Sequence, residues 1–103
     1  MSDRDRIPVS VIIPCLNAAD TLPRTLASVQ DFDEVILLDS YSRDGSRDIA
    51  HAYGARIDDF QWHGTYPKKK QWALDNVTTR HNWVFHLDAD EELSSELIHE
   101  IAR

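Results

Sequence analysis

The sequence predicts an α/β fold, a mostly parallel sheet with helices on both faces, and three observations support it. Short apolar runs alternate with segments of helical character along the chain, an order typical of parallel sheets with right-handed crossovers. The first two runs are dense in β-branched and other apolar residues, as strands buried on both faces are. Unusual polar residues follow the ends of the expected strands, where open α/β sheets bind ligands.

The first half of the chain predicts two strand–helix pairs. The β-branched, apolar run 9–13 predicts a strand. A helix is expected over 21–30, because its apolar residues recur at i, i+4 and i+7 and Asp20 is suited to cap its first turn. The run 35–38 predicts a second buried strand, and a short helix over 46–53 follows it and ends at a glycine.

The second half predicts two more pairs. Residues 55–58 indicate a weaker and more polar strand near an edge of the sheet, and a helix is expected over 67–77, with proline at its first position. The apolar run 83–85 predicts a buried fourth strand, and Ser94 is expected to cap the final helix. The expected apolar face of that helix consists of Leu97, Ile98 and Ile101.

Composition indicates one domain, 1–103, of ordinary globular type, with 42% hydrophobic and 28% charged residues. A formal net charge of −7 argues against non-specific nucleic-acid binding. No apolar run approaches the roughly 20 residues that span a bilayer, and no signal-peptide pattern opens the sequence. The single cysteine, Cys15, fits a reducing cytoplasm, and we expect it to be a packing residue rather than a nucleophile.

The acidic stretch after the fourth strand predicts a metal site. Asp88 and Asp90 lie two residues apart at a strand end, and paired carboxylates suit a divalent cation such as Mg²⁺, which prefers oxygen ligands and shares itself with phosphates. The alternative is that acidic residues complement the dipole of the following helix, and this interpretation is preferred for Glu91, Glu92 and Glu96. For the two aspartates the stretch alone supports both interpretations equally, and the strand-end position favours metal binding.

Asp39 and a lysine run, taken together with the carboxylate pair, favour a nucleotide diphosphate with a divalent ion. Asp39 ends an apolar strand, so its carboxylate needs a partner such as a nucleobase N–H group or ribose hydroxyls; N–H groups of its own turn are the alternative. Asp44 suits a turn or an N-cap better than a ligand contact. Lys70 ends a run of three lysines at a helix N-terminus, where phosphate is favoured, although a solvated surface is the alternative for two of them. Glycine-rich dinucleotide and P-loop motifs are absent from the sequence.

Four motifs, in order, resemble those of family-2 glycosyltransferases. They are Ser-Val-Ile-Ile-Pro at 10–14 with Asn17, Leu-Asp-Ser-x-Ser-x-Asp-Gly-Ser at 38–46, Lys-x-x-Ala-Leu at 70–74, and Leu-Asp-Ala-Asp-Glu at 87–91. The second and third look most like the branch that adds sugars to the lipopolysaccharide core. The resemblance implies the GT-A fold, in which a Rossmann-like half binds a nucleotide sugar.

The same resemblance implies roles for single residues. The nucleotide-binding residues that it implies are Pro14, Asn17, Asp39, Asp44, Lys70 and Asp88. Asp39 would contact the base, usually uracil, and Lys70 would lie near the phosphates. Asp88 and Asp90 occupy the Asp-x-Asp position, where Asp90 would be the direct ligand of Mg²⁺ or Mn²⁺ and the metal would neutralise the leaving diphosphate.

The chain departs from the family pattern in three places. Leu16 and Ala18 stand where relatives often carry an aromatic residue and a glutamate, and two extra lysines precede Lys70. Family members also continue for a comparable length beyond the position of Arg103. The carboxylate that acts as general base, and so the catalytic residue, is expected there.

These features predict the donor-binding domain of a glycosyltransferase. It would move a sugar from a nucleotide diphosphate sugar, in particular a UDP-sugar, to a saccharide or lipid-linked acceptor in cell-envelope or lipopolysaccharide synthesis. We expect a cytoplasmic protein, peripheral at the inner membrane, prone to self-association and inactive in transfer without the base-bearing half. The alternatives are a non-catalytic nucleotide-binding or interaction fragment, and a metal-dependent nucleotidyltransferase or phosphohydrolase. A nucleotidyltransferase would usually carry a glycine- and arginine-rich loop where residues 15–19 read Cys-Leu-Asn-Ala-Ala.

Overall fold

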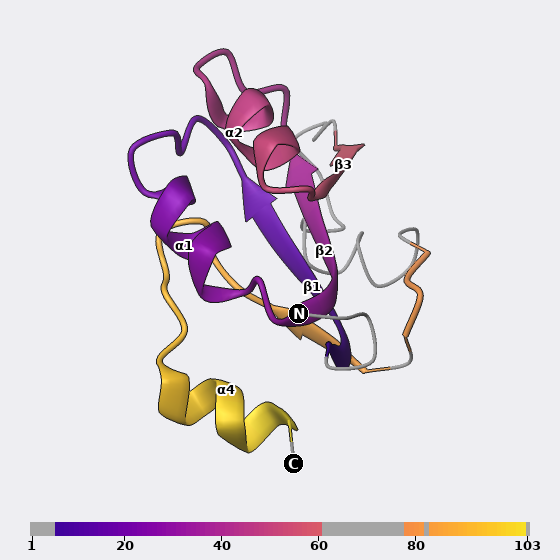
Figure 1. Ribbon diagram of the computed structural model, residues 1–103. Coiled ribbons are helices and arrows are strands. Elements are labelled where there is room, and N and C mark those ends of the chain that lie inside the picture. The colour runs from indigo at the N-terminus through magenta and orange to yellow at the C-terminus, as the bar shows by residue number, and fades with distance from the viewer. Residues whose placement is uncertain (1–5, 61–77, 82, 103) are drawn as a thin grey trace.

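The computed structural model describes residues 6–60, 78–81 and 83–102. Their strands are β1 (Ile7–Cys15), β2 (Phe32–Asp39), β3 (Arg56–Asp59) and β4 (Val84–His86), and their helices are α1 (Leu22–Ser28), α2 (Ser46–Ala52) and α4 (Ser95–Ala102). The strands form one sheet in the order β3-β2-β1-β4 (Figure 1), and each described strand pair is parallel. The predicted α/β class and parallel sheet are therefore confirmed.

The strand order reverses at β1. From β1 the chain moves outward through β2 to β3, which is an edge strand of the described sheet as predicted, and then returns to place β4 on the other side of β1. The carboxyl ends of the two central strands are level, because Cys15 pairs with Asp39 in the register of β1 and β2. Open α/β sheets bind ligands beyond the carboxyl ends of strands at such a reversal.

The core divides between the two faces of the sheet because successive strand residues point to opposite sides. Val11, Ile13 and Cys15 of β1 pack with α1 and α2 in one cluster, whereas Ile12 joins a smaller cluster on the other face. Both described crossover helices, α1 and α2, lie on the same side of the sheet (Figure 1). The helix predicted over 67–77 lies outside the described residues.

The N-terminal end of α1 corrects one prediction. Asp20 is not the N-cap: that position belongs to Thr21, which makes no side-chain capping bond. The Thr21 hydroxyl instead donates a hydrogen bond to the Ala89 carbonyl, 2.8 Å away. A tertiary contact thus replaces the local capping bond that the sequence pattern favoured. At α2 the predicted end is confirmed, since Gly54 follows the helix with φ of +80°.

The burial predicted for the final strand and helix is partly wrong. Trp83 precedes β4 instead of belonging to it and is 78% exposed, and β4 itself is half-buried because its one described neighbour is β1. Ser94 caps α4 as predicted, with its Oγ accepting a hydrogen bond from the Leu97 N–H. Leu97 nevertheless remains 43% exposed, because Ile98, one position on, is the residue that packs against the core. The side chain of Ile101 lies outside the described residues.

A polar cluster at the amino-terminal edge of the sheet fastens residues 78–81 to the start of β2. The buried carboxylate of Glu34 accepts hydrogen bonds from the Ser10 hydroxyl at 2.8 Å and the Arg80 N–H at 2.7 Å. Beside it, His81 Nε2 lies 2.7 Å from Asp33 Oδ2, and hydrogen bonds from His81 and Arg80 lower the pKa of Asp33. This cluster directs the chain into β4 from the edge opposite the candidate site.

Candidate functional site

The segments that follow β1, β2 and β4 begin at the same edge of the sheet. The Ser40 N–H donates to the Cys15 carbonyl at 3.0 Å. This bond holds the start of the loop after β2, here called the second loop, against the end of β1. On the other side of β1, the Leu87 N–H donates to the Ile12 carbonyl at 3.0 Å. The sequence-predicted residues of these three segments are therefore brought to one edge.

Asp39 is the buried centre of this edge. Its side chain is fully buried, and its carboxylate accepts hydrogen bonds from the Ser42 N–H at 2.9 Å, the Ser42 hydroxyl at 2.5 Å and Arg47 Nη1 at 3.1 Å. Burial alone would raise the pKa of Asp39, but the bonds from Ser42 and Arg47 outweigh it and lower that pKa below its ordinary value. The turn contact weighed as the alternative for Asp39 is present, and contact with a base stays a prediction.

Hydrogen bonds of Ser42 and Asn17 join the loop after β1, here called the first loop, to the second loop. Ser42 Oγ accepts a hydrogen bond from the Asn17 N–H at 2.8 Å, and Asn17 Oδ1 accepts one from the Arg43 N–H at 2.8 Å. Asn17 has φ of +50°, in the left-handed region that asparagine tolerates better than most residues. Tyr41 also has positive φ, +56°, and the residue is 55% exposed. The exposed Asn17 thus has a structural role as a link between loops.

Asp44 and Ser46 form a second link. Asp44 accepts hydrogen bonds from the Ser46 hydroxyl at 2.6 Å, the Ser46 N–H at 2.9 Å and the Ala19 N–H at 3.0 Å, while Ser46 Oγ accepts one from Ala18. These bonds, above all that from the Ser46 hydroxyl, lower the pKa of Asp44. The turn role preferred for Asp44 is confirmed, although the N-cap itself is Gly45.

Cys15 and Pro14 complete the end of β1. Cys15 is buried, and burial is the main cause that raises the pKa of its thiol, so the packing role predicted for it is confirmed. Pro14 is half-buried next to it. Lys70 lies outside the described residues, so its place near the phosphates stays a prediction.

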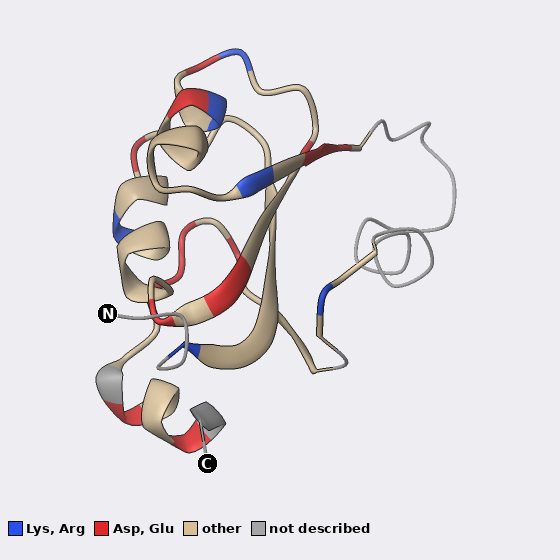
Figure 2. Cartoon of the chain, turned by 45° about the vertical axis from the view of Figure 1, so that its right-hand side comes forward, with Lys and Arg blue, Asp and Glu red and all other residues tan. Residues whose placement is uncertain are grey.

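Arg47, on α2, was not singled out by the sequence patterns. Its guanidinium bridges two carboxylates, those of the buried Asp39 and of Asp59 at the end of β3, with Nη1 2.5 Å from Asp59 Oδ1. Basic and acidic segments therefore adjoin around α2 and β3 (Figure 2). Both carboxylates, first Asp59 and then Asp39, raise the pKa of Arg47. Arg47 directly follows the motif at 38–46, and this position was the only feature of the sequence that could have pointed to it.

We expect Arg47→Met to raise the pKa of Asp39, because the substitution removes one charged donor and leaves burial unopposed by it. The side chain of Arg47 is 39% exposed, so solvent screens the pair and the expected loss of unfolding free energy is only about 1 kcal/mol. Carboxyl carbon shifts of Asp39 in an NMR titration measure the pKa. Arg47→Lys is the matched control and should give a smaller rise; an unchanged Asp39 pKa in Arg47→Met would contradict the prediction.

The acidic turn, residues 87–91, follows β4. Leu87 and Ala89 are buried and alternate with exposed Asp88 and Asp90, so the apolar residues anchor the turn and the carboxylates face outward. The turn closes on itself, since the Glu91 N–H donates to the Asp88 carbonyl at 3.0 Å and the Asp88 N–H donates to Glu91 Oε1 at 3.1 Å. Glu91 therefore has a structural role within the turn; the complement to the dipole of the following helix, which the sequence alone favoured for it, stays a prediction.

Two exposed carboxylates are a partial ligand set. Within the described ranges, no group of three or more histidine, cysteine or acidic side chains is placed to hold a metal ion. The oxygen-only pair Asp88 and Asp90 fits Mg²⁺ or Mn²⁺, hard cations that keep several waters and take further oxygens from substrate phosphates. These two residues would hold such a cation, with its remaining positions open to a ligand.

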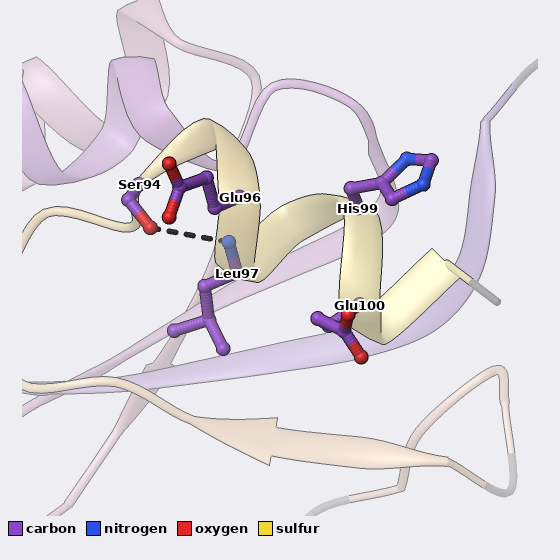
Figure 3. A pocket seen from close by; sticks show the side chains of 5 residues that line it. All are labelled: Ser94, Glu96, Leu97, His99 and Glu100. Atoms are coloured by element: carbon purple, nitrogen blue, oxygen red, sulfur yellow. Dashed lines mark hydrogen bonds between the residues drawn. The ribbon is translucent and has the colours of Figure 1, made fainter.

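A hollow elsewhere on the described surface is not this site. It lies along α4 and is lined by Ser94, Glu96, Leu97, His99 and Glu100 (Figure 3). All five residues come from one helix and its cap, and none follows the carboxyl end of a strand. We therefore place the candidate site at the edge formed by Asp39, Asn17 and the acidic turn.

The family model for glycosyl transferase family 2 matches residues 10–103. The chain belongs to glycosyl transferase family 2. An uncharacterised glycosyltransferase of Rickettsia bellii is 38% identical over 94 residues, which cover 90% of this chain and 31% of the relative. The lipopolysaccharide core biosynthesis glycosyltransferase LpsC of Rhizobium meliloti is 32% identical over 97 residues, which cover 89% of this chain and 35% of LpsC. This family-2 domain thus spans about a third of the length of these relatives.

Solved structures agree with the GT-A fold of this family-2 domain. Glucosyl-3-phosphoglycerate synthase from Mycobacterium tuberculosis, in complex with Mn²⁺, UDP and glucosyl-3-phosphoglycerate, matches with a TM-score of 0.64 and 26% identity over 82% of this chain and 35% of the synthase. TarS of S. aureus (residues 1–349) matches with a TM-score of 0.69 over 91% of this chain and 31% of TarS, at 24% identity, and shows the fold alone. In the part of the family-2 domain that is described, no helix is both long and apolar enough to cross a membrane.

Proposed function

We propose that this family-2 domain binds the donor of a glycosyl transfer from a UDP-sugar to an acceptor hydroxyl. One observation carries the proposal: the loop after β1, the loop after β2 and the acidic turn all lie at the edge where the strand order reverses. A structure 26% identical to this chain binds UDP and Mn²⁺, which supports the same donor class. Family membership favours glycosyl transfer over nucleotidyl transfer or phosphohydrolysis.

In this proposal the two linked loops receive the nucleoside. Exposed Leu16 and Tyr41, on the first and second loop, offer apolar surface to a base ring. Asp39 reaches the uracil N–H after Arg47 withdraws towards its second carboxylate partner, Asp59. Pro14, Asn17 and Asp44 shape the loops around the nucleoside, and Lys70 is assigned to the phosphates.

The acidic turn provides the metal-binding side of the proposed site. Asp90 is the direct ligand and Asp88 the second carboxylate, and a Mg²⁺ or Mn²⁺ ion held there would neutralise the charge that develops on the leaving diphosphate. The base that deprotonates the acceptor is assigned to a part of the enzyme beyond residue 103. We therefore expect residues 1–103 by themselves to bind donor and metal, and to transfer sugar very slowly or not at all.

We assign the acceptor to a saccharide or lipid-linked molecule of lipopolysaccharide or another cell-envelope polysaccharide. The support is the 32% identity to LpsC, a lipopolysaccharide core biosynthesis glycosyltransferase. We also propose a cytoplasmic location at the inner membrane. We also propose that the chain self-associates; Trp83 and Leu97 are exposed apolar side chains that could take part.

Calorimetric titration with UDP, with and without Mn²⁺, tests the proposed function. We expect UDP to bind, and Mn²⁺ to raise its affinity at least about tenfold through charge-assisted contacts to the diphosphate. Uridine, which has no diphosphate, is the matched ligand and should bind weakly and equally with or without Mn²⁺. If the chain is folded by circular dichroism but does not bind UDP, the donor-site proposal is wrong. The chain would then be a non-catalytic relative of the family.

A further inference from the structure

Helix α1 and its N-cap residue, Thr21, hold the acidic turn through two threonine hydroxyls. Thr21 Oγ1 donates to the Ala89 carbonyl at 2.8 Å, and Thr25 Oγ1 donates to the same carbonyl at 2.9 Å. The donors are four residues apart and so lie on one face of the helix. Because a carbonyl oxygen has two lone pairs, the two hydroxyls saturate it.

Both hydroxyl oxygens lie closer to the Ala89 carbonyl in the turn than to the nearest carbonyl of their own segment. Threonine within a helix commonly bonds back to the carbonyl four residues earlier, and Thr25 Oγ1 lies 3.4 Å from the Thr21 carbonyl but only 2.9 Å from that of Ala89. Thr21 Oγ1 likewise lies 3.4 Å from Ala18 O and 2.8 Å from Ala89 O. Thr25 and Ala89 are 1% and 8% exposed, so water does not readily replace the bond between them.

The bonded carbonyl belongs to the residue between the two aspartates. The Ala89 carbonyl and the Asp90 N–H share one planar peptide unit, so holding the carbonyl restricts the orientation of the Asp90 backbone. The same face of α1 makes a third contact beyond the turn, where Ser28 Oγ accepts a hydrogen bond from the Leu93 N–H at 3.1 Å. The acidic turn is thus held at its centre and on its far side by one helix.

We propose that Thr21 and Thr25 are positioning residues for metal binding, and that they hold Asp88 and Asp90 in one arrangement before a cation arrives. Neighbouring carboxylates repel each other when no cation is present, so an unrestrained turn would separate them. Binding sites need their ligand groups held within a few tenths of an ångström by supporting hydrogen bonds. The inference rests on the proposed function, because it takes the two aspartates as the metal ligands.

Thr25→Val tests the proposal, since it removes the hydroxyl and keeps the branched shape. Two quantities are measured: amide hydrogen exchange of residues 87–91 in the absence of ligand, and the factor by which Mn²⁺ raises the affinity for UDP. We expect faster exchange in the turn and a roughly fivefold smaller Mn²⁺ factor, as loss of one shielded hydrogen bond implies. The affinity for UDP without metal should be unchanged.

Two controls separate positioning from general stability. Thr25→Ser retains the hydroxyl and should restore both quantities. Ser10→Ala removes another fully buried hydroxyl, one bonded to Glu34 at the opposite edge of the sheet, and should change neither. If Thr25→Val lowers stability as Ser10→Ala does but leaves the turn exchange and the Mn²⁺ factor at wild-type values, the threonines are only structural and the inference is overturned.

A failure of the proposed function gives a different result. The wild-type chain would then show no Mn²⁺ factor at all, which removes the metal-positioning role together with the donor site. Hydrogen exchange would still decide whether the threonines order the acidic turn. A wild-type Mn²⁺ factor that Thr25→Val leaves intact counts against the inference alone.

Discussion

Replacing Asp39 by asparagine is expected to lower the free energy of unfolding by about 2–4 kcal/mol, because three hydrogen bonds to a buried carboxylate are weakened or lost together. Asparagine keeps one oxygen acceptor, but its NH₂ group would face the donors of Ser42 or Arg47. Urea unfolding at pH 7 measures the loss. Asp48→Asn, which makes the same change at an exposed position of α2, is the control and should stay within about 0.5 kcal/mol of wild type.

The difference between wild type and Asp39→Asn should shrink in acid. The pKa of Asp39 is lowered in the folded chain, so the ionised carboxylate contributes stability that is fully present above its unfolded pKa of about 3.9 and is lost as the pH falls through its folded value. Unfolding curves at pH 7 and at successively lower pH below about 4 measure this. A difference that stays constant over that range, or a loss under about 1 kcal/mol at pH 7, would show that the hydrogen bonds to Asp39 stabilise little.

Asp90→Asn is expected to abolish the gain in UDP affinity that Mn²⁺ produces, leaving the affinity with metal within about twofold of that without it. An asparagine oxygen carries no charge, and removal of even an outer partner of a metal ligand typically costs 10–100-fold in affinity. Asp88→Asn should reduce the gain less, because Asp90 is proposed as the direct ligand. Titrations of each variant with UDP, at matched Mn²⁺ concentrations, measure the gain.

Glu92→Gln is the matched control for this prediction. Glu92 is exposed directly after the acidic turn, so its replacement removes the same charge close to the aspartates without removing a proposed ligand. The Mn²⁺ gain should be nearly unchanged. Equal losses in Asp90→Asn and Glu92→Gln would indicate diffuse electrostatic attraction in place of a metal site.

Much of the fold could be predicted from the sequence because hydrophobic periodicity is a local property. The runs at 9–13 and 35–38 lie inside β1 and β2, and residues 46–53 correspond to α2 with one residue beyond it. The alternation of these elements predicted a parallel sheet, and therefore predicted that Asp39 and the acidic turn meet at one edge. Exposure at the sheet margin could not be predicted in this way: Trp83 follows the apolar pattern of a buried strand but is 78% exposed.

The sequence by itself determined the order of the elements, the family and the edge at which the polar segments gather, since each depends on local pattern and on motif order. Local turn bonds, such as those from Ser42 to Asp39, were among the sequence-based alternatives, and only the tertiary structure decided the long-range partners of those side chains. The bond from Arg47 to Asp39 joins a helix to a strand end, and the bonds from Thr21 and Thr25 to Ala89 join residues 68 and 64 positions apart. A hydrogen bond between distant segments depends on the relative placement of both, and no periodicity within either segment encodes that placement.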